Sequence, residues 1–311
     1  MTAPEPARIV SLLPSATEIL FALGLGDAVR AVTHECDFPP EAKSRRVLVR
    51  PAFDPHRLKP REIDEAVATR VRNGESVYVI DEEGLAEEQP DLVVTQSLCE
   101  VCAVATGHVD RALERLSRRP QVVTLHPHTL HDILEDIARV GEATARVREA
   151  GDLVAALKRR IDSVRQAAAG APRPSVACLE WYDPLYSAGH WVPEMVEIAG
   201  GRPLLAQTGQ PSARVDWRAV VEAAPDVLVL MPCGYDAWRA LDELPALTAL
   251  PGWDQLPAVR SGQVWAVNAH AYFNRPGPRI VDGLEVLAWI LHPDRFAPPG
   301  DPGAAARAVV G

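Results

Sequence analysis

Side chains that can bind metal ions follow three predicted strands in the first half of the chain. The strands are expected at 29–33, 91–95 and 122–125. The metal-binding side chains that come after them are His34, Cys36, Cys99, Cys102 and His126. Thiolate and imidazole groups are ligands that zinc, iron and cobalt ions accept readily. We therefore predict a metal or metal-cofactor site here, and a redox dithiol at Cys99-Glu-Val-Cys102 or simple packing of small buried thiols are the alternatives.

Aromatic side chains occupy the corresponding places in the second half of the chain. Trp181-Tyr182 follows the strand expected at 175–179, Tyr272-Phe273 follows the strand expected at 264–267, and Trp217 begins a predicted helix. Such rings stack well against a large flat ligand, so we predict ligand contact for them; the alternative is that they cap the core beneath the loops. Three further tryptophans lie within or beside predicted helices and are expected in the core: Trp238, Trp253 and Trp289.

Common nucleophilic and nucleotide-dependent enzymes carry motifs that this sequence lacks. It has neither a GxSxG elbow nor a Walker A loop. Ser187 and His190 are close in sequence, but no third group or strained turn accompanies them. We therefore expect a non-catalytic binding protein. The alternative is a metal-dependent enzyme or metallochaperone that uses the Cys and His loops of the first half.

A long amphipathic helix is predicted at 146–169, near the middle of the chain. Its apolar residues recur in steps of three and four: Val147, Ala150, Val154, Leu157, Ile161, Val164 and Ala168. A rise of about 1.5 Å per residue gives a length of about 35 Å. Strands and helices alternate on both sides of this helix. The pattern predicts an α/β fold of two Rossmann-like lobes with mainly parallel sheets, bridged by the helix, with a ligand cleft between the lobes.

The predicted domain boundaries follow from this division. We expect an N-terminal α/β lobe at 8–141, the bridging helix at 142–172, a C-terminal α/β lobe at 173–296 and a flexible Pro/Gly/Ala-rich tail at 297–311. In parallel sheets, the loops after the carboxyl ends of the strands form the binding edge. The metal-binding and aromatic side chains are therefore expected at these edges.

Composition excludes several classes of partner. The chain has 311 residues and a formal net charge of −10, which disfavours binding to nucleic acid. No apolar run approaches the length of about 18 residues that would suggest insertion into a membrane. The first eight residues carry no basic and apolar signal segment, and the five cysteines suit a reducing compartment. We predict a cytoplasmic location for the chain as it stands, or a periplasmic one if a leader has been trimmed.

The segment Arg8-Ile-Val-Ser-Leu-Leu-Pro-Ser-Ala-Thr-Glu-Ile-Leu resembles the opening of the cobalamin-binding proteins of ABC importers, whose two lobes are bridged by one helix. The likeness continues through Cys36-Asp-Phe-Pro-Pro40, Gln89-Pro-Asp-Leu-Val93 and Glu197-Ile-Ala-Gly-Gly201, over roughly residues 8–295. It implies a small-molecule ligand, namely cobalamin, another corrinoid, or a related tetrapyrrole or metal chelate. His34, Cys36 or His126 would then supply an axial ligand to the cobalt.

The same resemblance implies which loops hold the ligand. The matching positions are Pro14, Ser15, Asp37, Phe38, Gln96, Ser97, Trp181, Tyr182, Trp217, Tyr272 and Phe273. Proteins of this class dock on an ABC transporter permease through one carboxylate on each lobe. Glu83 matches the first carboxylate, whereas Arg218 stands where the second is expected. Together with the additional helix and strand at 62–80, this departure predicts a cytoplasmic branch that has kept the receptor fold.

Overall fold

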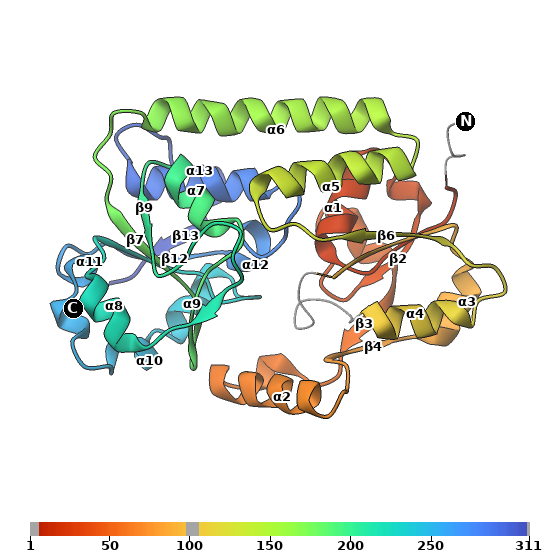
Figure 1. Cartoon of the computed structure of the whole chain (residues 1–311), viewed down its shortest axis with the longest axis horizontal. Coiled ribbons are helices and arrows are strands. Elements are labelled where there is room, and N and C mark those ends of the chain that lie inside the picture. The colour runs from red at the N-terminus through yellow and green to blue at the C-terminus, as the bar shows by residue number, and fades with distance from the viewer. Residues whose placement is uncertain (1–5, 98–105, 310–311) are drawn as a thin grey trace. The chain divides into compact units, whose positions relative to one another are not determined.

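The computed structural model describes residues 6–97 and 106–309. By its internal contacts the chain divides into two compact units. Unit 1 comprises Met1–Pro127 and His131–Ala156, and unit 2 comprises His128–Leu130 and Leu157–Gly311. Each unit is an α/β structure built around one sheet, as Figure 1 shows. Within the described residues, no helix has the length and apolar character needed to span a membrane.

Unit 1 contains a six-stranded sheet in the order β4-β3-β2-β1-β5-β6. The strands are β1 (Ile9–Ser11), β2 (Val29–Thr33), β3 (Arg46–Pro51), β4 (Tyr78–Ile80), β5 (Leu92–Gln96) and β6 (Gln121–Leu125). The helices are α1 (Pro14–Ala22), α2 (Pro60–Arg72), α3 (Glu82–Glu88), α4 (Thr106–Glu114) and α5 (Leu130–Ala143). All pairs are parallel except β3–β4. The carboxyl ends of β2, β1, β5 and β6 therefore lie side by side at one edge.

Unit 2 contains a mixed seven-stranded sheet in the order β10-β8-β7-β11-β12-β13, with β9 pairing to β7. The strands are β7 (Ser175–Tyr182), β8 (Leu185–Ser187), β9 (Arg202–Leu204), β10 (Ala213–Arg214), β11 (Val227–Leu230), β12 (Val264–Val267) and β13 (Ala305–Arg307). The helices are α7 (Val192–Ile198), α8 (Trp217–Ala223), α9 (Ala237–Asp242), α10 (Pro245–Thr248), α11 (Pro257–Arg260), α12 (Ala269–Tyr272) and α13 (Ile280–Leu291). The central strands β7, β11 and β12 are parallel neighbours.

Helix α6 (Val147–Ala168) confirms the predicted long helix. Its 22 residues correspond to about 33 Å. The expected apolar stripe is largely buried, at Ala150, Leu157, Ile161, Val164 and Ala168. Val147 departs from the prediction because it is the first helical residue and is 61% exposed. The α/β class and the two-lobe division by one long helix are thus as the sequence predicts.

Several local predictions are wrong. Ser15 and the Glu18 residue three positions later could form a capping box by their types, but Pro14 starts α1, Leu13 is its N-cap, and both Ser15 and Glu18 are buried within the helix. The predicted helix that contains Trp238 ends before Pro245, where a second short helix begins, so that the segment forms α9 and α10. Trp238 is 63% exposed and does not belong to the core. The expected loose tail contains β13, which pairs antiparallel with β12.

Candidate functional site

The parallel strands of unit 2 bring a polar and aromatic cluster to one edge of the sheet. We call it the unit 2 edge cluster, and it consists of Glu180, Trp181, Tyr235, Arg239, His270 and Arg275. These residues come from the end of β7, from the loop and helix α9 that follow β11, and from helix α12 and the loop that follow β12. The Trp181 and Tyr235 rings are in edge-to-face contact at 5.5 Å between centroids. The backbone N–H of His270 donates to the Tyr235 carbonyl oxygen at 3.0 Å. These contacts therefore connect the segments that follow the three neighbouring strands β7, β11 and β12.

A β-bulge in β7 determines which way Trp181 faces. Leu179 pairs with Ser187 on β8 and Trp181 pairs with Tyr186, so Glu180 is an extra residue in its strand. Leu179 and Tyr182 both belong to the core cluster on one face of the sheet. In a regular strand, Trp181 would share that face with Leu179, since side chains alternate. The bulge instead keeps both Glu180 and Trp181 off the core face.

Two cations belong to the unit 2 edge cluster. The Arg239 guanidinium lies 3.9 Å from the centroid of the Tyr235 ring and donates to the Tyr235 hydroxyl at 3.3 Å. Arg275 is 5% exposed, and its guanidinium donates to the ring of His270. An aromatic surface beside fixed positive charge suits a large conjugated ligand with polar substituents.

Trp181 is the member of the cluster that the sequence predicted, and Glu180 is one of those that it did not. Oε2 of Glu180 accepts a hydrogen bond from the Ser212 hydroxyl at 2.7 Å. Part of the residue is exposed, but the crowded surroundings of the carboxyl group raise its pKa to about 7, an effect that the Ser212 bond partly opposes. A glutamate at the end of a predicted strand is not by itself a sign of function. No sequence pattern predicts the bulge that places Glu180 here.

The structure separates the aromatic residues that were predicted to contact ligand. Tyr182 and Phe273 are 4% and 1% exposed and lie in the interior, so ligand contact stays a prediction for both. The Tyr182 hydroxyl donates to the Ala240 carbonyl oxygen at 3.1 Å. Trp217 is half-buried, stacks on Trp253 and donates to the Pro251 carbonyl oxygen, so it packs against the core. Trp181, at the strand edge, remains the best placed to meet a ligand.

Tyr272 is half-buried and its ring is accessible in part. Its hydroxyl donates to Asp301 at 2.7 Å, and the guanidinium of Arg279 lies 5.7 Å from the ring centroid. Burial and the Asp301 bond raise the pKa of Tyr272 to about 12, so it is a neutral phenol at physiological pH. It therefore offers a ring surface rather than a charge.

In unit 1 the structure brings Ser97 and His126 together at the edge. They follow the neighbouring parallel strands β5 and β6, and both are exposed. The Ser97 hydroxyl lies 3.0 Å from His126 Nδ1. Behind them Asp136 on α5 is 2% exposed, and its burial raises the pKa of its carboxyl to about 6 against the opposing effect of Arg139. The sequence analysis did not single out Asp136, because its position fits an ordinary helix pattern.

Among the other predicted ligand residues of unit 1, exposure varies widely. Ser15 and Gln96 are buried, at 1% and 5% exposure. Pro14 and Asp37 are half-buried, and Phe38 is 41% exposed. Phe38 therefore presents the largest accessible apolar side chain of this set, next to the end of β2.

The predicted thiol and imidazole ligands are only partly described. Cys36 is buried, and its Sγ accepts hydrogen bonds from the Thr17 hydroxyl at 3.0 Å and the Thr33 backbone N–H at 3.4 Å. His34 Nδ1 lies 3.2 Å from the Val49 carbonyl oxygen. Cys99 and Cys102 lie outside the described residues. Over 6–97 and 106–309, no group of three or more His, Cys, Asp or Glu is arranged to hold a metal ion. Metal binding by the five predicted residues stays a prediction.

Glu83, the predicted docking carboxylate, is exposed in the first turn of α3. Arg218 is exposed in the first turn of α8, and its Nε donates to Glu222 at 2.6 Å, one turn further along the helix. Each side chain is accessible on its own unit.

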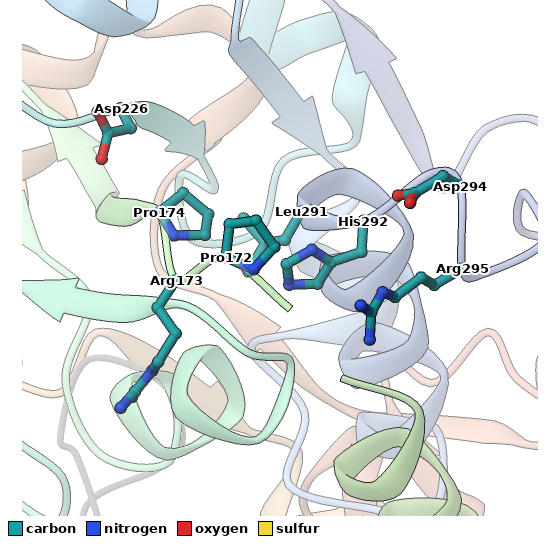
Figure 2. A pocket seen from close by; sticks show the side chains of 8 residues that line it. All are labelled: Pro172, Arg173, Pro174, Asp226, Leu291, His292, Asp294 and Arg295. Atoms are coloured by element: carbon teal, nitrogen blue, oxygen red, sulfur yellow. The ribbon is translucent and has the colours of Figure 1, made fainter. Parts of the chain in front are cut away.

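A pocket of about 520 Å³ in unit 2 is lined by the residues shown in Figure 2. Asp226 and Pro174 line it where β11 and β7 begin, so it is at the opposite edge of the unit 2 sheet. Its two arginines are engaged with backbone: Arg173 donates to the Gly201 carbonyl oxygen and Arg295 to those of Ala167 and Ala169. None of the predicted ligand residues contributes to this pocket.

Comparison with known proteins gives consistent results over most of the chain. A profile of the periplasmic binding protein family matches residues 9–271. The vitamin B12-binding protein of Vibrio cholerae is 27% identical over 299 residues, which cover 94% of this chain and 91% of the relative. An uncharacterized ABC transporter substrate-binding lipoprotein of Bacillus subtilis is 27% identical over 300 residues, or 94% of this chain and 82% of the relative.

Solved structures agree on the fold. A periplasmic heme-binding protein from Pseudomonas aeruginosa superposes with a TM-score of 0.73 at 19% identity, over 98% of this chain and 100% of that one. The alternative of a metal-dependent enzyme or metallochaperone finds no support in the family profile or in the vitamin B12-binding relative. The chain belongs to the periplasmic binding protein family and is a substrate-binding protein rather than an enzyme.

Proposed function

We propose that this protein binds a corrinoid of the vitamin B12 type. The observation that carries the proposal is the near full-length similarity to the vitamin B12-binding protein of Vibrio cholerae. The unit 2 edge cluster supports it physically. Trp181 offers a partly accessible aromatic ring for a macrocycle, Tyr235 supports that ring from beneath in edge-to-face contact, and the bulge in β7 keeps Trp181 off the core face.

Haem is the second candidate ligand. The Pseudomonas aeruginosa neighbour is described as heme-binding, and its likeness to this chain concerns the fold. The observation that favours haem is the presence of Arg239 and Arg275 in the cluster, because guanidinium groups pair well with the carboxylates at the rim of haem.

Titration calorimetry with cyanocobalamin and with haemin distinguishes the two ligands. We expect cyanocobalamin to bind with a Kd below about 1 µM and haemin at least about tenfold more weakly. At a concentration of about 100 times the Kd, cyanocobalamin should also stabilise the fold by about 2.7 kcal/mol in a denaturation experiment. Tight binding of haemin without binding of cyanocobalamin would reverse the assignment, and binding of neither would refute both.

For the ligand contacts, we propose Trp181 and Tyr272 in unit 2, because both residues are partly accessible. In unit 1 we retain the predicted residues, with Phe38, Asp37 and Ser97 as the accessible members. The remaining ones are Pro14, Ser15 and Gln96. His126 is the exposed candidate for an axial ligand to cobalt, whereas Cys36 is buried and hydrogen-bonded. A His126→Ala variant that gives the same absorption spectrum with bound corrinoid as the parent would exclude that role.

We also propose an ABC transporter permease as partner, since a relative is described as an ABC transporter substrate-binding lipoprotein. Glu83 on α3 is the proposed contact. We expect Glu83→Arg to reduce co-purification with the permease while leaving ligand affinity unchanged. Cell fractionation tests the location. Recovery of the protein in the periplasmic fraction would contradict the predicted cytoplasmic location, whereas recovery in the cytoplasm alone would contradict docking on an importer permease.

A further inference from the structure

Glu180 and Trp181 share one environment because of the bulge in β7. The two residues oppose a single position of β8, and both leave the face on which Leu179 and Tyr182 enter the core. Bulges of this kind occur at binding sites, where they redirect a side chain that strand alternation would bury. A carboxyl group thus stands next to the tryptophan that we propose as the main ligand contact.

A short chain of hydrogen bonds fixes the Glu180 carboxyl. Gly189 N–H donates to the Ser212 Oγ at 3.1 Å, and the Ser212 hydroxyl donates to Glu180 Oε2 at 2.7 Å. Only glycine allows this approach, because a Cβ at position 189 would come within 2.5 Å of the Gln210 carbonyl oxygen and the Ser212 nitrogen. The backbone carbonyl of Glu180 is held as well, by the N–H of Cys233 at 3.0 Å.

The remaining oxygen, Oε1, has no hydrogen-bond partner within the part of the chain that the structure describes. An oriented carboxyl oxygen of this kind accepts readily from a neutral N–H of a ligand. When it is ionised, the Glu180 carboxyl group repels a ligand carboxylate, because like charges that lie close together with little surrounding water repel one another. Corrinoids carry carboxamides at the rim of the macrocycle, whereas haem carries carboxylates.

We propose that Glu180 is a specificity-determining residue that favours macrocycles with neutral carboxamides at the rim over macrocycles with carboxylates there. This inference rests on the proposed function, because it assumes that the ligand of the Trp181 edge is a macrocycle. Arg239 and Arg275 retain their roles as cations of the cluster.

The preference should depend on pH. Burial raises the pKa of Glu180 to about 7, so this carboxyl ionises between about pH 6 and pH 8. Cys178 on the same strand has a pKa of about 12 and Tyr235 in the adjoining loop a raised one, so neither ionises in that range. His190 beside the Ser212 loop and His270 in the cluster are two further titratable side chains of this region. A substitution is therefore needed to assign the effect to Glu180.

The test compares cobyrinic acid with its heptaamide, which share one macrocycle and differ in carboxylates against carboxamides. Affinities are measured by calorimetry at pH 6 and pH 8 for the parent protein and for Glu180→Gln, which keeps an oxygen to accept from Ser212 but carries no charge. In the parent protein, we expect the ratio of the affinity for the heptaamide to the affinity for cobyrinic acid to be about tenfold larger at pH 8 than at pH 6. In Glu180→Gln, we expect this ratio at pH 8 to be about tenfold smaller than in the parent. Glu222→Gln, on the exposed face of α8, is the matched control and should behave like the parent.

A preference that is the same in the parent and in Glu180→Gln would overturn the inference, even if both corrinoids bind. Failure of both corrinoids to bind would instead refute the proposed function. In that case the same comparison is made with haem and its dimethyl ester. If Glu180→Gln leaves the preference for the ester over haem unchanged, the inference is overturned independently of the proposed function. Binding of none of the four ligands overturns both.

Discussion

Replacing Trp181 with alanine is expected to weaken the binding of cyanocobalamin by about 30-fold or more. Trp181 is the half-buried aromatic residue that the bulge turns off the core face, and its ring contacts Tyr235 at 5.5 Å. Truncation of a central aromatic contact commonly costs about 2–4 kcal/mol of binding free energy. Calorimetric titration of the variant measures the loss directly.

Trp238→Ala is the matched control for this prediction. Trp238 lies on α9 of the same unit but is 63% exposed, and it makes no part of the unit 2 edge cluster. Its removal should leave the affinity within about a factor of two, because an isolated surface side chain contributes little. Equal losses in both variants, or no loss for Trp181→Ala in a protein that remains folded, would show that the ligand does not bind at this edge.

Gly283→Ala is expected to destabilise the protein by about 2–4 kcal/mol, although alanine is normally the better helix former. Gly283 lies within α13, where a Cβ would stand 2.2 Å from the carbonyl oxygen of Tyr272 and 3.3 Å from Met195. The clash involves backbone, so no side-chain rotation relieves it. Either α13 or the segment that carries Tyr272 must shift, and ligand affinity should fall together with stability.

The matched control is Gly151→Ala in α6, where no atom outside the local helix lies within 4 Å of the new Cβ. Here the higher helix propensity of alanine compared with glycine should stabilise the protein by about 0.5–1 kcal/mol. Urea denaturation of both variants gives the two free energies of unfolding. Stabilisation by Gly283→Ala would contradict the close contact between α13 and Tyr272.

Elements that depend on local sequence could be predicted well. The spacing of apolar residues along α6 gave its position to within a residue or two, and the run at 29–33 gave the bounds of β2. Strand–helix alternation sufficed for the α/β class, because each crossover places its strands in parallel. The resemblance at Arg8–Asp27 pointed to the family that the later comparison identified.

Elements that depend on pairing could not be predicted from local sequence. β3 is a short run between charged residues, and its partner is β2, which precedes it by more than ten residues. β13 has the sequence Ala-Ala-Arg, which has little strand propensity by itself, and it forms by pairing with β12.

The candidate site shows the same limit at the level of single residues. Trp181 and Tyr182 are adjacent aromatic residues and look equivalent in sequence. Only the bulge at Glu180 decides that Trp181 stays at the edge while Tyr182 enters the core. Phe273 was expected to meet ligand but is fully buried, since its place after α12 directs it inward.

A crystal structure of the protein with cyanocobalamin tests the central claim most directly, since the anomalous signal of cobalt locates the macrocycle independently of the protein. We predict a cobalt peak whose corrin ring lies within about 4 Å of Trp181, in van der Waals contact with the unit 2 edge cluster. Electron density for the corrinoid in the pocket of Figure 2, or the absence of a cobalt peak at a saturating concentration, would contradict this account.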